Sequence, residues 1–134
     1  MPSIVNTFKD SENPLIWVFD FTEGIVVSDS QYFAPPIPDV FNGHASMHVT
    51  ITSGQVTIQG QSDNSGQDKN FITGYDTAGT VLPALCTALT TSKFFAEINL
   101  PAARRNRWKF TESSGSAPVT GIAYLYLRRD NINI

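Results

Sequence analysis

The stretch His48 to Gln61, HVTITSGQVTIQGQ, decides the fold of this chain. From Met47 onward apolar and polar residues alternate, and the alternation continues on the other side of Ser53-Gly54. A period of two predicts β-strands with one buried face, because successive side chains point to opposite faces of a sheet. Ser53-Gly54 would serve as a two-residue hairpin loop that pairs Ile51 with Val56; a slightly longer loop is the alternative, since Ser is poorly suited to φ > 0. Such a pair needs a second layer over its apolar face.

The rest of the chain repeats this pattern of short apolar or alternating runs, separated by turn residues. Seven or eight short strands at spacings of about ten residues predict an all-β fold: an antiparallel β-sandwich, jelly-roll-like. One short helical turn is expected around residues 82–90, where Leu82, Leu85, Cys86 and Leu89 have helical spacing after Pro83. The alternation predicts a core that contains Val49, Ile51, Val56, Ile58, Trp108, Phe110, Leu125 and Leu127.

A length of 134 residues favours one domain with a proper core. Residues 1–14 are predicted to be an N-terminal arm, or a frayed terminus, and residues 15–134 a single β-sandwich domain. Pro35 and Pro36 belong to a stiff extended loop, which suits either a protein contact or a connector across the sandwich. No signal peptide and no membrane-length apolar run is visible, so we expect synthesis in a cytoplasm and retention there or in a particle assembled there.

The residues needed for catalysis or metal binding are sparse. His44 and His48 share a strand face, but the closest acids in sequence are Asp39 and Asp63, so nothing nearby completes a metal site. Cys86 is the only cysteine, and its apolar flanks favour burial over reactivity. No nucleophile elbow, phosphate loop or zinc-protease motif occurs. We therefore predict no enzyme activity, no catalytic or cofactor-binding residue and no metal.

Charge is distributed unevenly along the chain. Residues 1–40 hold six acids and one base, a net charge of −5, whereas residues 104–134 hold six bases and two acids, a net charge of +4. This asymmetry indicates neutralisation within the fold or charge-matched contact between copies or partners. Direct nucleic-acid binding is the weaker interpretation, because the whole chain carries −3.

Two surfaces stand out as candidate protein interfaces. Alternation places three bases on one strand face and two tyrosines on another, and Arg and Tyr are enriched in interfaces. Each pattern also fits a plainer role: a solvated face that blocks edge aggregation, or a second packed layer with hydroxyl groups at its rim. The candidate interface residues are Arg105, Arg107, Lys109, Tyr124, Tyr126, Pro35, Pro36 and Phe8.

Several short segments between residues 45 and 129 resemble the tailed-phage capsid cement (decoration) proteins. The segments are Met47 to Ile51, Val56 to Asp63, Phe95 to Pro101, Arg105 to Phe110 and Gly121 to Leu125. In that family a strand pair leads into a "TSDD"-like loop, followed by an "IPLP"-like strand end, an "RYLR"-like strand and a "GxxTAFL"-like final strand. This chain departs from the pattern at Asn106-Arg107-Trp108, and residues 1–40 match nothing in it.

The resemblance implies a virion structural protein on the capsid surface, assembled in the cytoplasm of a bacterial host. It would bind the outside of the shell built by the major capsid protein, contact other copies of itself as a dimer or trimer, and stabilise the mature head. Neither a membrane nor direct nucleic-acid contact is implied. A modest interface suffices for such a role, because many copies act together on a lattice.

Two other classes compete with this interpretation. A carbohydrate-binding or tail-fibre β-sandwich module would need an exposed aromatic platform, for which Trp17, Trp108, Tyr124 and Tyr126 are candidates. Buried tryptophans favour the cement protein, and a flat row of exposed aromatic residues favours the carbohydrate-binding module. A small hydrolase of the cupin kind would need His44 and His48 to converge with an acid.

Overall fold

The computed structural model describes residues 7–13, 15–34, 43–65, 71–74, 77–100 and 105–129, and only the backbone of 43–44, 99–100, 105 and 127–129. These residues form strands joined by turns, and no helix occurs among them. The strands are β1 (Thr7–Lys9), β2 (Ile16–Ile25), β3 (Ser30–Phe33), β4 (Gly43–Ser53), β5 (Val56–Asp63), β6 (Ile72–Thr73), β7 (Cys86–Leu89), β8 (Lys93–Leu100), β9 (Arg105–Glu112) and β10 (Val119–Arg129).

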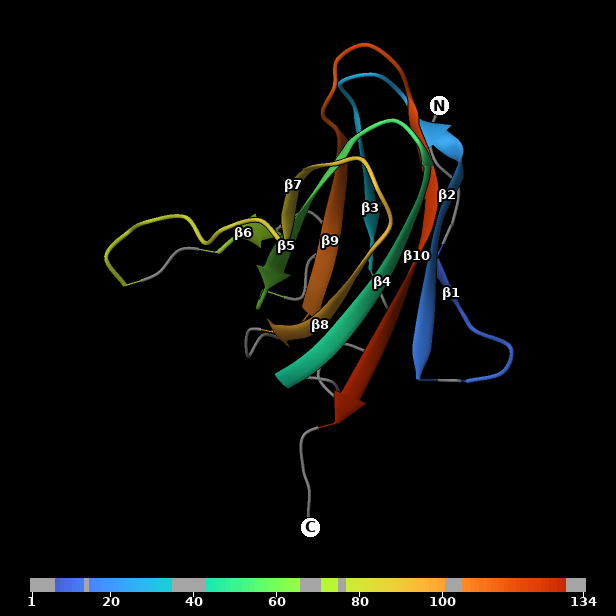
Figure 1. Ribbon diagram of the computed structural model, residues 1–134. Helices are drawn as coiled ribbons and strands as arrows, with labels where there is room; N and C mark the ends of the chain where they lie inside the picture. The colour runs from blue at the N-terminus through green and yellow to red at the C-terminus, as the bar shows by residue number, and fades with distance from the viewer. Residues whose placement is uncertain are drawn as a thin grey trace.

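Two antiparallel sheets pack face to face (Figure 1). Sheet A has the order β1-β2-β10-β4-β8, and sheet B has the order β3-β9-β5-β6 with β7 also paired to β5. The pairs β2·β10, β3·β9, β4·β8 and β5·β6/β7 are nested in the sequence, as in one long hairpin rolled into two layers. This is the order of a jelly roll, so the predicted all-β jelly-roll-like sandwich is confirmed. Strand β1, which falls inside the predicted N-terminal arm, extends the edge of sheet A.

The core lies between the two sheets and follows the predicted alternation. Six of the predicted core residues are buried, Val49, Val56, Ile58, Trp108, Phe110 and Leu125, and Ile51 is half-buried against the same cluster. The side chain of Leu127 lies outside the described residues. Four phenylalanines form the centre, Phe19 and Phe21 from sheet A with Phe33 and Phe110 from sheet B. Between the sheets their ring centroids lie 5.0 to 6.4 Å apart, so the two layers interlock through aromatic contacts.

The predicted hairpin at Ser53-Gly54 is wrong, because β4 and β5 belong to opposite sheets. The chain crosses from sheet A to sheet B here, so Ile51 and Val56 are not ladder partners; β4 pairs with β10 and β8. Gly54 has φ +92°, and a Cβ on it would lie 2.5 Å from the Cα of Val119. A glycine is required at this crossing, because it provides both the backbone conformation and the close approach.

The predicted helical turn around residues 82–90 is also wrong. Cys86–Leu89 is strand β7, whose residues Cys86 and Leu89 pair with Ile58 and Val56. Leu85 adds a backbone hydrogen bond of 2.8 Å, donated by its N–H to the carbonyl oxygen of Ile58. A helix this short has only marginal stability by itself. The edge of β5 instead offers hydrogen-bond partners to the backbone of this segment. Leu85 and Cys86 still pack against the core. The apolar spacing therefore indicated core contacts correctly, although the segment is extended and not helical.

A buried carboxylate organises one end of the sandwich. Glu112, at the end of β9, is 2% exposed. Its oxygens accept hydrogen bonds from the Ser114 hydroxyl and from the backbone N–H groups of Ser28, Ser114 and Gly115. These donors, the Ser114 hydroxyl foremost, lower the pKa of Glu112 to about 2. The carboxylate thereby joins the turn after β2 to the turn after β9.

We predict that this carboxylate makes stability depend on acid. Its folded pKa of about 2 lies below the ordinary value of 4.5, so its stabilisation is present above pH 4.5 and is lost as pH falls through 2. Glu112→Gln should lower stability at neutral pH and flatten the fall in unfolding free energy over this range. Urea unfolding at several pH values checks this, with exposed Glu97→Gln as control. The same pH slope in both variants would contradict the assignment.

We also predict that alanine at Gly54 is far more damaging than at Gly79. Both glycines have positive φ, but a Cβ on Gly79 meets nothing within 4 Å. Gly79→Ala should therefore cost only conformational strain, about 1–2 kcal/mol. Gly54→Ala adds a clash with the backbone of Val119 and should cost about 3 kcal/mol or more. Thermal and denaturant unfolding measure both, and equal losses would show that the crossing tolerates a side chain.

Candidate binding surfaces and pocket

The outer face of sheet A carries one row of side chains that crosses all five strands. The strand register pairs Phe8 with Val18, Val18 with Tyr124, Tyr124 with His48, and His48 with Phe94. These five residues are called the aromatic row below. The ring centroid of His48 lies 5.9 Å from that of Tyr124 and 6.2 Å from that of Phe94. Five segments that are far apart in sequence therefore form one contiguous surface.

The aromatic row is apolar and open to solvent at its ends. Phe94 is 61% exposed and Phe8 is 48% exposed. Val18 is only 3% exposed although it does not belong to the core cluster, so its neighbours on the outer face cover it. A contiguous apolar surface of this kind marks an interaction site more often than scattered single residues do.

Three predicted interface residues lie on this face. Tyr124 and Phe8 belong to the aromatic row, and Tyr126, half-buried like Tyr124, follows on the same side of β10 opposite Ser46 and Ile16. The predicted placement of the two tyrosines on one strand face is confirmed. Their role in an interface stays a prediction.

Phe94 was missed because the alternation in β8 is interrupted. Strict alternation would place Phe94, Ala96 and Ile98 on one face of β8, but the register with β4 shifts between Phe95 and Ile98. This bulge directs Phe95 and Ile98 toward the core, while Phe94 and Ala96 are exposed. The two adjacent phenylalanines are equally apolar, so only the bulge decides which one faces solvent.

The outer face of sheet B carries the predicted basic strand, and Arg107 is held there by its own chain. The guanidinium carbon of Arg107 lies 4.1 Å from the ring centroid of Tyr32 and 4.5 Å from that of Phe71. Its Nε donates a 2.8 Å hydrogen bond to Oε1 of Gln61. Burial lowers the pKa of Arg107 from its ordinary value, although an arginine stays charged at neutral pH. Stacking between two rings ties the segment at Phe71 to sheet B.

The remaining predicted interface residues are only partly described. Lys109 is half-buried, opposite Tyr32 and Gln59 in the register of sheet B. The backbone of Arg105 pairs with Asp63, and its side chain lies outside the described residues. Pro35 and Pro36 also lie outside them.

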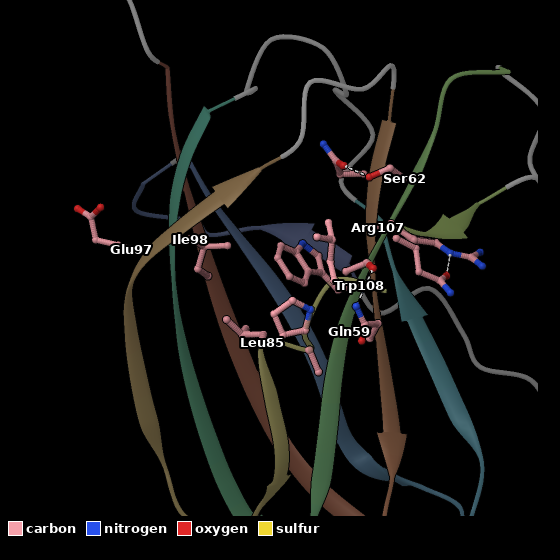
Figure 2. Close-up of a pocket in the computed structure, with 14 residues that line it drawn as sticks. Gln59, Ser62, Leu85, Glu97, Ile98, Arg107 and Trp108 are labelled. Atoms are coloured by element: carbon pink, nitrogen blue, oxygen red, sulfur yellow. Dashed lines mark hydrogen bonds between the residues drawn. The ribbon is translucent and has the colours of Figure 1, made fainter. Parts of the chain in front are cut away.

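A pocket of about 300 Å³ lies between the two sheets. It is bounded by β5 and β9 of sheet B, by β8 of sheet A and by residues 82–85. Figure 2 shows Trp108, Leu85 and Ile98 turned toward one another, whereas Glu97 and Arg107 point away on opposite sides. Its walls are therefore largely apolar, and Gln59 and Ser62 are among the polar residues that line it.

The described residues contain no cluster of three His, Cys, Asp or Glu side chains that could hold a metal ion. His48 is exposed in the aromatic row, and the side chain of His44 lies outside the described part. Cys86 is half-buried, and desolvation raises the pKa of its thiol, which disfavours a nucleophilic thiolate. What the described surface offers is contact area and a pocket. Across the described ranges, no helix is long and apolar enough to cross a membrane.

No protein-family model, curated protein or solved structure matches this chain. The likeness to capsid cement proteins therefore rests on the short segments quoted from the sequence.

We predict that Arg107→Lys loosens the segment at Phe71 without unfolding the sandwich. Lysine keeps the charge but loses the flat guanidinium that stacks on both rings, a contact worth about 1–2 kcal/mol. Hydrogen exchange at Ile72 and Thr73, the residues of β6, should therefore accelerate by about tenfold. Lys109→Gln, on the same strand face, is the control and should leave these amides unchanged. Unaltered exchange in Arg107→Lys would show that the stack does not hold the segment.

Proposed function

We propose that this chain is a virion structural protein, a capsid cement or decoration protein that binds the outside of the major capsid shell and stabilises the mature head. The aromatic row is the observation that carries the adhesive role, because an exposed apolar surface is costly unless a partner covers it. The short sequence segments point to the capsid shell as that partner. The jelly-roll order of the strands agrees with the fold that this resemblance implies.

The aromatic row suits docking onto a large rigid partner. It is carried by hydrogen-bonded strands of one sheet, and the inner face of that sheet is fixed by the core. A prearranged surface loses little conformational entropy on binding, and aromatic side chains are frequent anchors. Asp20 and Thr50, which lie opposite Ile122 in the strand register, provide polar groups at the rim of this surface. Many copies on a lattice make a modest contact of this size sufficient.

Charge-matched contacts between copies are the second part of the proposal. The acids of residues 1–40 and the bases of residues 104–134 lie on chain segments of opposite net charge. In a dimer or trimer, or on an acidic shell surface, such groups speed association and make it salt-dependent. Arg107 is committed to Tyr32, Phe71 and Gln61, so Lys109 is the better described candidate for this contact.

A carbohydrate-binding or tail-fibre module is the second candidate function. Trp17 and Trp108 are each 5% exposed, so neither provides the platform that a sugar chain would need. The aromatic row does carry exposed rings, with Phe94 and Phe8 at its ends, and sugar rings stack on exposed aromatic side chains. The buried tryptophans favour the cement protein, and the exposed rings of the aromatic row favour the carbohydrate-binding module.

We predict that Phe8→Ser combined with Phe94→Ser reduces occupancy of the protein on the particle with which it co-purifies by at least about tenfold. Removing two exposed rings from an anchor should cost at least ~1.4 kcal/mol of binding, the energy of a tenfold change. Electron microscopy and quantitative gel analysis of the particles measure occupancy. Folding should be unaffected, because both side chains lie on the outer face.

Val26→Ser is the matched control, since Val26 is 64% exposed but lies off the aromatic row. Equal occupancy of the double variant and the control would reject the row as the contact surface. Retention on particles together with lost binding to a polysaccharide column would instead support the carbohydrate-binding function. Repeating the assay with Lys109→Gln over a salt series tests the charged contact separately.

A further inference from the structure

The pocket between the sheets has a distinct chemical lining. At about 300 Å³ it lies at the lower end of the range for ligand sites, so it fits one ring rather than a chain of rings. Leu82, Pro83, Leu85 and Ile98 give it aliphatic walls. Trp108 supplies an aromatic surface, and these side chains come from both sheets and from the segment that follows β6.

Gly60 keeps the space beside the indole open. A Cβ at this position would lie 3.5 Å from Cζ3 of Trp108, in ordinary van der Waals contact with the ring. The glycine has no positive φ that would require it, and the strand would accept alanine. The missing side chain therefore leaves room for another group to contact the six-membered ring of Trp108.

The polar side chains that are not turned away from the pocket are neutral, and one acceptor among them has no donor in the described part of the chain. Gln61 accepts from Arg107, and Ser62 donates to Asn106 over 2.7 Å. Nε2 of Gln59 makes one long contact of 3.4 Å with the carbonyl oxygen of Gly60. Within the described residues, no group donates to Oε1 of Gln59. The charged groups of Glu97 and Arg107 point away from the space, as Figure 2 shows.

We propose that this pocket binds an uncharged aromatic ring with one hydroxyl group, a phenol, supplied by a small molecule or by a tyrosine side chain of a partner. The ring contacts Trp108 and the aliphatic walls, and the hydroxyl donates a hydrogen bond to Oε1 of Gln59. A buried phenol requires such an acceptor, and aromatic rings pack well against an indole. This site lies beyond the proposed capsid function and does not depend on it.

Other ligand classes fit this lining less well. A sugar ring carries hydroxyl groups around its whole rim, and several would face aliphatic walls without a hydrogen-bond partner, which is costly. A purely apolar ring would leave the amide of Gln59 unsatisfied. A carboxylate or an ammonium group would lose its hydration without meeting an opposite charge that points inward.

Titration of the isotope-labelled protein with p-cresol tests the site. The indole N–H signal of Trp108 and the side-chain amide of Gln59 should shift with a millimolar dissociation constant, as expected for a ligand of one ring. Toluene, benzoate and glucose should bind at least about tenfold more weakly, a difference set by one unmade hydrogen bond or one unpaired charge. No shift at Trp108 with p-cresol, or equal binding of toluene or glucose, would overturn the proposal.

Two variants locate the ligand within the pocket. Gly60→Ala fills the space beside the indole and should weaken p-cresol binding at least about tenfold, whereas Gln59→Ala removes the acceptor and should weaken it about three- to tenfold. Gln55→Ala, which changes a half-buried glutamine outside the pocket, is the matched control and should bind normally. Melting temperatures confirm that each variant is folded. Undiminished binding by both pocket variants would place p-cresol elsewhere and reject the site.

A competition assay on co-purified particles distinguishes the two sources of the phenol. If a partner's tyrosine fills the pocket, saturating p-cresol releases the protein from the particle. If a free small molecule is the ligand, occupancy on the particle is unchanged while p-cresol still binds at Trp108. Each result supports a phenol site and assigns its source, and neither depends on the residues of the aromatic row.

Discussion

The contact between four phenylalanine rings at the centre of the sandwich is the interaction on which the rest of this structure depends. Phe19 and Phe21 come from one sheet, and Phe33 and Phe110 come from the other. Burying each ring contributes about 1.5–3 kcal/mol, and edge-on and stacked geometries add to this. The inner faces of the two sheets stabilise the fold. The outer faces are therefore not needed for the core, and they carry the aromatic row on sheet A and the stacked Arg107 on sheet B.

Alternation in the sequence predicted which side of each strand is buried, but not which strands are neighbours. Val49 and Ile58 are both in the core, as the pattern requires, yet they reach it from opposite sheets. The same alternation of apolar and polar residues is expected on both sides of the turn, whether the two strands form a hairpin or the chain crosses from one sheet to the other. What distinguishes them here is the close approach of Val119 to Gly54, a contact between positions 65 residues apart that no local pattern contains. Strand β7 also depends on a contact that no local pattern contains. Cys86–Leu89 is extended because it pairs with the edge of β5.

The sequence predicted those parts of the candidate surfaces that lie on a single strand, but not the parts that depend on contacts between strands. Tyr124 and Tyr126 share a face because they are two residues apart, and this was visible in the sequence. The aromatic row also requires the register of five strands and the bulge that exposes Phe94 rather than Phe95. Arg107 was predicted as an interface residue, but its two stacking partners lie in other segments of the chain. The pocket was not predicted, because its lining comes from both sheets and a loop.

The nested strand order also determines when this protein can fold during its synthesis. Strand β10 lies in the middle of sheet A, between β2 and β4, although it is the last of the described strands to be made. Sheet A therefore cannot close until Val119–Arg129 has left the ribosome, and β2 must wait for about a hundred further residues before it can pair with β10. Folds dominated by such distant pairings form slowly and expose unpaired strand edges in the meantime. A nascent chain of this protein is consequently most vulnerable to aggregation just before β10 is translated.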